Sequence, residues 1–164
     1  MPIVADTSPL NYLVLIDAVE ILPQLFGEVV IPEAVSNELL HPLAPAKVRE
    51  FVARRPDWLQ IVKAPVSSME GLEHLDAGEV EAILLMTATE ARLLAMDDRA
   101  GVAAARERGL RVIGTIGVLD AAARRGTIDL KSALEQLGKT TFRMPKRVLE
   151  ELLSGSRSAS GGNP

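Results

Sequence analysis

The stretch that decides the fold is residues 2–10, PIVADTSPL, where a short apolar run ends at Asp6 and a helix start follows. The run from Pro2 to Ala5 is typical of a buried strand. Ser8 and Pro9 then indicate a helix with Ser8 as its N-cap and Pro9 at its first helical position. This order predicts a strand whose last residues deliver an acid, followed at once by a helix.

The same order recurs along the chain. Four further apolar runs are predicted strands, at residues 29–31, 59–62, 92–96 and 111–113. Helices are predicted between and after them: a second short helix ended by Pro23, then residues 32–40, 45–55, 76–88, 99–108, 115–125, 129–138 and 145–153. Strands that alternate with helices imply a mostly parallel sheet covered on both faces. We therefore predict an α/β fold, a three-layer sandwich with a mostly parallel central sheet.

Length and composition limit the class of protein. The 164 residues suit one domain, which we place at residues 1–153, with a small polar tail at 154–164 expected to be disordered. There is no cysteine, which excludes disulfides, cysteine-bound zinc and a thiol nucleophile. No apolar run approaches the roughly 18 residues of a membrane span, and the N-terminus lacks the pattern of a signal peptide. We expect a soluble cytoplasmic protein without a membrane partner.

The charge is distributed unevenly. The net charge of −4 argues against a generic basic nucleic-acid binder. However, residues 1–98 carry 6 Lys/Arg against 16 Asp/Glu, and residues 99–164 carry 12 against 6. An acidic half and a basic half suit a metal site flanked by a surface that meets phosphates. The alternative is chance segregation of charges on solvated faces.

Two acids follow predicted strands directly. Asp6 ends the first strand, and Asp97 ends the strand at residues 92–96, with Asp98 next to it. Ligands bind at the carboxyl ends of parallel strands, and a buried carboxylate is costly unless it is paired or binds a cation. We take Asp97 as a ligand and Asp98 as the N-cap of the next helix or an outer partner. The alternative for Asp6 is a turn residue that accepts hydrogen bonds from the following helix.

Two further acids lie on helices. Asp76 and Glu79 have the spacing of a capping box, which alone would explain both. Glu79 also lies on the apolar side of its helix, where Gly78 leaves room, whereas Glu81 points about 200° away and is expected to face solvent. Glu38 lies beside the apolar stripe of residues 32–40, and its default interpretation is a surface glutamate.

Together these acids predict a metal site. Clustered carboxylates cannot all ionise at close range without a cation, and oxygen ligands without cysteine or a histidine pair favour Mg²⁺ or Mn²⁺ over zinc. We predict Asp6, Glu79 and Asp97 as metal ligands. Ser8 would order a metal-bound water, unless it serves only as a helix cap. A metal ion bound there would lower the pKa of a bound water.

The motifs resemble those of the PIN-domain nucleases, and more narrowly the VapC-like branch with an SPL start and a GExEAI helix. The resemblance covers residues 2–153 and is carried by these segments: Asp6-Thr7-Ser8-Pro9-Leu10, Glu38 after Val30-Ile31-Pro32, Leu75–Ile83, Leu94–Asp98, Gly114–Leu119 and Gly126–Ile128. It implies metal-dependent ribonuclease activity, with Asp6, Glu38, Glu79 and Asp97 as the catalytic acids. Many members have aspartate where Glu79 stands.

The resemblance also implies partners: RNA, a second copy in a homodimer, and a small antitoxin that neutralises the protein as the toxin of a toxin–antitoxin pair. One alternative is a catalytically weak or inactive PIN-like module that binds nucleic acid or protein. Another is an aspartyl-phosphate protein. That class needs an acidic pair or an Asp-x-Asp motif after the first strand, which Thr7 and Ser8 do not supply.

Overall fold

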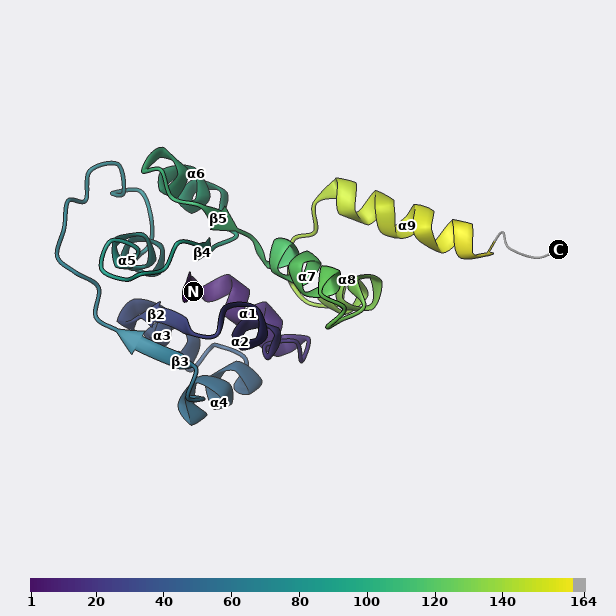
Figure 1. The fold of residues 1–164 in the computed structure, drawn as a ribbon, viewed down its shortest axis with the longest axis horizontal. Helices are drawn as coiled ribbons and strands as arrows, with labels where there is room; N and C mark the ends of the chain where they lie inside the picture. Colours follow the sequence, from purple (N-terminus) through teal and green to yellow (C-terminus); the bar gives the residue numbers. More distant parts are fainter. Residues whose placement is uncertain (161–164) are drawn as a thin grey trace.

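The structure, a computed structural model, describes residues 1–160. Its centre is a five-stranded sheet in the order β3-β2-β1-β4-β5, in which all neighbours are parallel (Figure 1). The strands are β1 (Ile3–Ala5), β2 (Val29–Pro32), β3 (Leu59–Val62), β4 (Leu94–Ala95) and β5 (Val112–Ile113). All five carboxyl ends therefore lie at the same edge of the sheet, which confirms the predicted α/β class.

Helices cover both faces of this sheet. They are α1 (Thr7–Leu15), α2 (Ile21–Phe26), α3 (Glu33–Leu40), α4 (Ala46–Arg54), α5 (Ala77–Leu85), α6 (Arg99–Glu107), α7 (Thr115–Arg124), α8 (Leu130–Gly138) and α9 (Lys146–Ser160). Side chains alternate between faces along a strand. Ile3 and Ala5 accordingly pack in one cluster with α1, α2, α4 and α7, whereas Val4 packs in a second cluster with α5 and α6. The result is a three-layer sandwich.

The strands are short, and three of them are buried along their whole length. Every residue of β1, β2 and β4 is buried, and these strands contain only aliphatic residues and one proline. Such continuous apolar runs are typical of parallel strands between two helical layers. A charged side chain directly after such a strand is therefore held against the core by a segment that cannot easily shift.

The predicted start of the first helix is wrong by two residues. Asp6, not Ser8, occupies the N-cap position of α1, and Pro9 lies at its third helical position. Pro23 likewise lies in the first turn of α2 and does not end it. The N–H groups of a first helical turn have no acceptor within the helix, so proline loses no hydrogen bond there.

The last helix continues beyond the predicted boundary. We expected a helix at residues 145–153 and a disordered tail from 154, but α9 runs from Lys146 to Ser160. It begins against the domain, where Val148 is buried, and extends away from the sheet (Figure 1). Residues 161–164 of the predicted tail lie outside the described part of the chain. Among the described residues, no helix has the length and apolar character needed to cross a membrane.

Candidate active site

Asp6 is a buried acid at the carboxyl edge of the sheet. Its backbone N–H donates to the carbonyl of Ala95 in β4 at 2.9 Å, which extends the pairing of β1 with β4. Only 5% of the residue is exposed. Its carboxylate makes no capping hydrogen bond within α1, so capping does not explain why an acid stands here. Burial raises the pKa of Asp6 to about 7, although the Thr7 N–H opposes this shift.

Other carboxylates surround Asp6. The charges of Asp76, Glu79 and Glu38 each raise its pKa further. Glu38 projects from α3 and accepts a 2.6 Å hydrogen bond from the Thr7 hydroxyl. A Cβ atom on Gly78 would lie 2.6 Å from Oε1 of Glu38 and 3.4 Å from Oδ1 of Asp6. The absence of a side chain at position 78 thus allows α3, α5 and the end of β1 to bring their acids together.

Glu79 belongs to two arrangements at once. It forms the predicted capping box with Asp76: its N–H donates to Oδ1 of Asp76 at 2.8 Å, and its carboxylate accepts from the Asp76 N–H at 3.3 Å. The residue is nevertheless buried, and its carboxyl lies within hydrogen-bonding reach of Asp98. Burial, followed by the charges of Asp76 and Asp98, raises the pKa of Glu79 to about 7. The capping box therefore does not explain why the Glu79 carboxyl is buried and lies near Asp98.

The two adjacent aspartates after β4 have different partners. Asp98 is the N-cap of α6, where it accepts from the N–H groups of Ala100 and Gly101 at 3.1 and 3.2 Å. Asp97 accepts from the backbone N–H of Thr115 at 2.7 Å and from its hydroxyl at 2.6 Å. Burial raises the pKa of Asp97, and both Thr115 bonds oppose the shift. Asp98 therefore caps a helix as predicted and also meets Glu79, whereas Asp97 fastens the start of α7 to β4.

The structure thus brings Asp6, Glu38, Asp76, Glu79 and Asp98 to one edge, with Asp97 after the neighbouring strand. Within residues 1–152, the ion pairs are Lys47–Asp17 and Arg124–Asp120, so no basic side chain in this range neutralises these acids. No group of three or more acidic, histidine or cysteine side chains in this range is arranged to hold a metal as it stands. The acids instead accept hydrogen bonds from Thr7, from Thr115 and from backbone N–H groups in the first turns of α5 and α6.

The prediction that Glu81 faces solvent is wrong. Its residue is half-buried, and its Oε2 atom accepts a 2.9 Å hydrogen bond from the backbone N–H of Ala34. Ala34 lies in the first turn of α3, where N–H groups lack partners within the helix. Glu81 therefore ties α5 to the start of the helix that carries Glu38, and it is not a neutral control for substitutions at the site.

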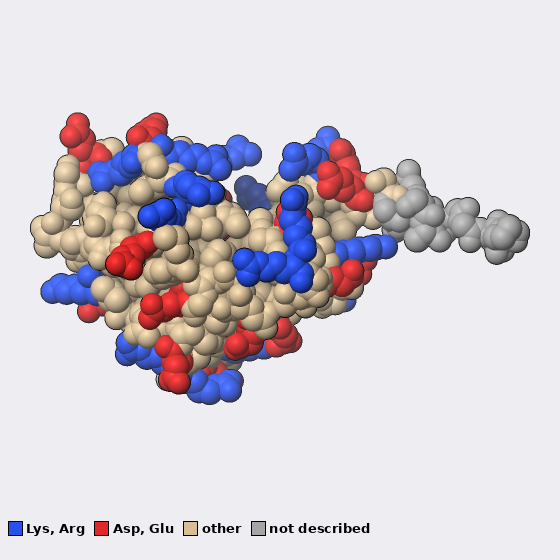
Figure 2. Space-filling model, in the orientation of Figure 1, with Lys and Arg blue, Asp and Glu red and all other residues tan. Residues whose placement is uncertain are grey.

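A cleft of about 800 Å³ opens beside Asp97 and Asp98. Ser8, Arg99, Arg143 and Lys146 also line it, whereas Asp6, Glu38, Asp76 and Glu79 do not. Figure 2 shows the corresponding hollow between α6 and the start of α9, with Lys and Arg side chains on both of its sides. Ser8 does not cap α1, and its role near a reacting water stays a prediction.

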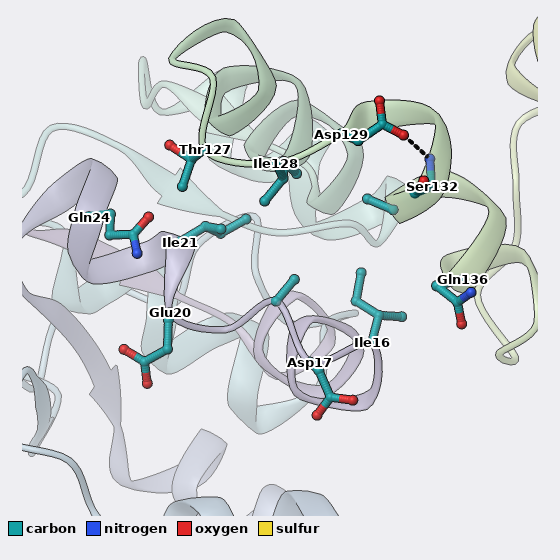
Figure 3. A pocket seen from close by; sticks show the side chains of 12 residues that line it. Ile16, Asp17, Glu20, Ile21, Gln24, Thr127, Ile128, Asp129, Ser132 and Gln136 are labelled. Carbon is teal, nitrogen blue, oxygen red and sulfur yellow. Dashed lines mark hydrogen bonds between the residues drawn. The ribbon is translucent and has the colours of Figure 1, made fainter.

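A second hollow, of about 430 Å³, lies away from the acids (Figure 3). Ile16, Glu20 and Gln24 line one side, after the end of α1, and Asp129 and Ser132 line the other. Since α1 starts at the carboxyl edge of the sheet, these residues lie toward its opposite edge. The Asp129 carboxylate caps α8 by accepting from the Ser132 N–H at 3.0 Å. Asp129 therefore serves as a helix cap, and the carboxylates that line this hollow are exposed.

Gly78 provides a test of the site's geometry. Gly78→Ala should lower RNA cleavage about tenfold or more, because the new Cβ displaces Glu38 from Asp6 and from Thr7. Stability should change by less than about 1 kcal/mol, since Glu38 is exposed and alanine favours the helix. Gly138→Ala in α8 is the matched control, because no atom lies within 4 Å of its added Cβ. Equal cleavage by the two variants would contradict the role assigned to Glu38.

Sequence reasoning did not identify the partners that hold the acids. Thr7 orients Glu38, and Thr115 binds both oxygens of Asp97. Thr115 follows Gly114 directly after a predicted strand, which is a signal for a residue at the same sheet edge. Arg143 and Lys146 carry no such local signal, because only the path of the chain after α8 brings them to the cleft.

Comparison with known proteins gives one family. The model of the family DUF3368, described as a PIN domain, matches residues 2–158, which is nearly the whole chain. Neither the curated proteins nor the solved structures give a match. The matched range includes all the acids described above and extends into α9.

Proposed function

Because this chain belongs to the PIN-domain family, we propose that it is a nuclease that hydrolyses RNA phosphodiester bonds with Mg²⁺ or Mn²⁺. One observation supports this most strongly. Asp6 and Glu79 are buried carboxyls whose pKa values are raised to about 7, and no basic side chain in residues 1–152 pairs with them. A cation and a polyanionic substrate together explain why such costly groups stand at the sheet edge.

The residues fit a hard divalent cation in their chemistry. All candidate donors are carboxylate oxygens, which Mg²⁺ and Mn²⁺ prefer. Asp6, Glu79 and Asp97 would hold the ion, and when bound it would supply a water nucleophile at neutral pH and stabilise charge on the phosphate. Binding requires Asp97 to share an oxygen that Thr115 now engages, and Glu79 to turn from its capping box.

Each remaining residue has a defined task in this proposal. Thr7 holds Glu38 beside Asp6, so that Glu38 orients and deprotonates the attacking water. Asp98 fixes the start of α6 and, through its contact with Glu79, limits the positions that Glu79 can take. Ser8 in the cleft would hydrogen-bond the same water or a substrate oxygen. Gly78 keeps the space between α3 and α5 open.

The finer assignments remain predictions from the sequence motifs. These are membership of the VapC-like branch, action as the toxin of a toxin–antitoxin pair, neutralisation by an antitoxin, and a homodimer. The sequence motifs support them. Induced expression of the chain in a bacterial host, followed by a growth assay with Asp6→Asn as the control, would test the toxin assignment.

A second candidate is a PIN-like module that binds nucleic acid and cleaves it weakly or not at all. Two observations favour it: the described residues contain no ready three-ligand group, and both oxygens of Asp97 are engaged by Thr115. This alternative predicts RNA binding that is indifferent to Mn²⁺ and leaves the RNA intact.

A cleavage assay distinguishes the two functions. We expect purified protein to cut an end-labelled single-stranded RNA with Mn²⁺ or Mg²⁺ and to stop in EDTA. Because the nucleophile is water and not the ribose 2′-hydroxyl, the products should carry no 2′,3′-cyclic phosphate. Cyclic phosphate ends, or cleavage that persists in EDTA, would point to a contaminating ribonuclease. Intact RNA under all metal conditions would support the binding module.

A further inference from the structure

The segment from Thr141 to Lys146, between α8 and α9, forms a side of the cleft that the acidic site does not use. Thr141, Phe142, Arg143, Met144, Pro145 and Lys146 all line the cleft. Arg143 and Lys146 are exposed, and neither makes a hydrogen bond or ion pair within the described residues. Both cations therefore line the same cleft as Asp97 and Asp98, and no contact among the described residues engages either of them.

This segment is attached to the helix that starts at Asp6. The ring of Phe142 meets the ring of Tyr12 in α1 edge to face, with centroids 5.0 Å apart. The Tyr12 hydroxyl lies 3.0 Å from the hydroxyl of Thr141. The Phe142 N–H donates to the hydroxyl of Thr140 at 3.1 Å, and that hydroxyl donates to the carbonyl of Leu137 at 2.6 Å. These contacts hold the segment in a fixed position relative to the acids.

A third cation lies next to the acids. Arg99 follows Asp98 at the start of α6 and also lines the cleft. Lys and Arg side chains therefore lie on both sides of the hollow in Figure 2. A neutral ligand would gain nothing from this arrangement, whereas a chain of phosphates would meet the cations at its flanks and the acid-held ion at one phosphate.

We propose that the Thr141–Lys146 segment is a substrate-binding lip, in which Arg143 and Lys146 bind RNA phosphates that flank the bond to be cut. This proposal rests on the proposed nuclease function and assigns positioning residues to it. Tyr12 and Phe142 fix the lip to α1, so that the bound phosphates and the acids keep one spacing. The two cations add affinity and place the strand, and they take no part in bond cleavage.

Salt dependence of RNA binding tests the lip directly. Binding of a fluorescein-labelled oligouridine is followed by anisotropy in EDTA, where a metal-dependent enzyme does not cleave, at a series of salt concentrations. For single strands, each phosphate contact contributes about 0.7 to the slope of log affinity against log salt. Arg143→Gln with Lys146→Gln should therefore weaken binding and lower the slope by about 1.4.

A matched double variant provides the control. Arg147→Gln with Lys139→Gln also removes one Arg and one Lys, both exposed and close in sequence, and neither side chain lines the cleft. It should keep the wild-type slope. The lip would be overturned if all three proteins had equal slopes, or if both double variants lost the same RNA affinity. It would also be overturned if the wild-type protein did not bind the RNA. Binding with the expected slopes but without metal-dependent cleavage would overturn the nuclease function and support the lip.

Discussion

Replacing Asp6 with asparagine is expected to lower RNA cleavage more than about a hundredfold while the protein stays folded, since loss of a metal ligand should exceed the 10–100-fold typical of its outer partners. The amide is nearly isosteric, but it has neither the charge nor the second anionic oxygen that a hard cation requires. Without metal at pH 8, the variant should be more stable than the wild-type protein, because a buried charge is removed.

Asp57→Asn is the matched control for this substitution. Asp57 is exposed, its side chain makes no hydrogen bond among the described residues, and it precedes β3 at the edge opposite the acids. The Asp57→Asn variant should keep the cleavage activity and the stability of the wild-type protein. If Asp6→Asn kept the activity of Asp57→Asn, Asp6 would be a structural acid and the proposed site would be misplaced.

Stability without metal is expected to fall as the pH rises from 5 to 8, opposite to ordinary acid denaturation. The pKa of Asp6 is raised from 3.8 to about 7, so between these values the folded state binds more protons than the unfolded state. The free energy of unfolding therefore decreases with pH across this window. Asp6 alone should contribute a loss of about 2.5 kcal/mol between pH 5 and pH 8. Glu79, with its pKa also raised to about 7, acts in the same direction.

Metal should reverse this loss at pH 8. At 100 times its dissociation constant, a bound ion adds about 2.7 kcal/mol. Urea denaturation in EDTA at both pH values, repeated with Mn²⁺, measures the two effects. In Asp6→Asn, the loss of stability with rising pH should be smaller, because the titrating group is absent. The gain in stability from Mn²⁺ should also be smaller, because one metal ligand is absent. A wild-type protein whose stability in EDTA rises from pH 5 to pH 8 would contradict the buried-acid account.

The sheet and the acids on it could be predicted because they depend on local patterns. An apolar run followed by a helix start predicts a parallel strand, and parallel strands bring their ends to one edge. Asp6 and Asp97 were therefore placed correctly from their positions after two such runs. The capping box of Asp76 and Glu79 was equally local, and it formed as its spacing predicts.

The errors arose where a side chain's partner lies on another element. The orientation of Glu81 within α5 suggested solvent, but α3 packs against that side and presents the Ala34 N–H to it. Pro9 predicts Ser8 as the cap, yet the end of β1 puts Asp6 in that position. The basic lip depends on a turn after α8 whose direction is fixed by packing of Phe142 on Tyr12.

Proton release on metal binding tests the central claim most directly. At pH 6, Asp6 and Glu79 are mostly protonated, because their pKa values are about 7. Binding of Mn²⁺ must then displace roughly one to two protons, and far fewer at pH 8. Isothermal titration calorimetry in buffers of different ionisation enthalpy counts these protons. The account predicts release at pH 6 that falls toward zero at pH 8 and is reduced in Asp6→Asn. Binding without proton release at either pH, or no Mn²⁺ binding at all, would contradict it.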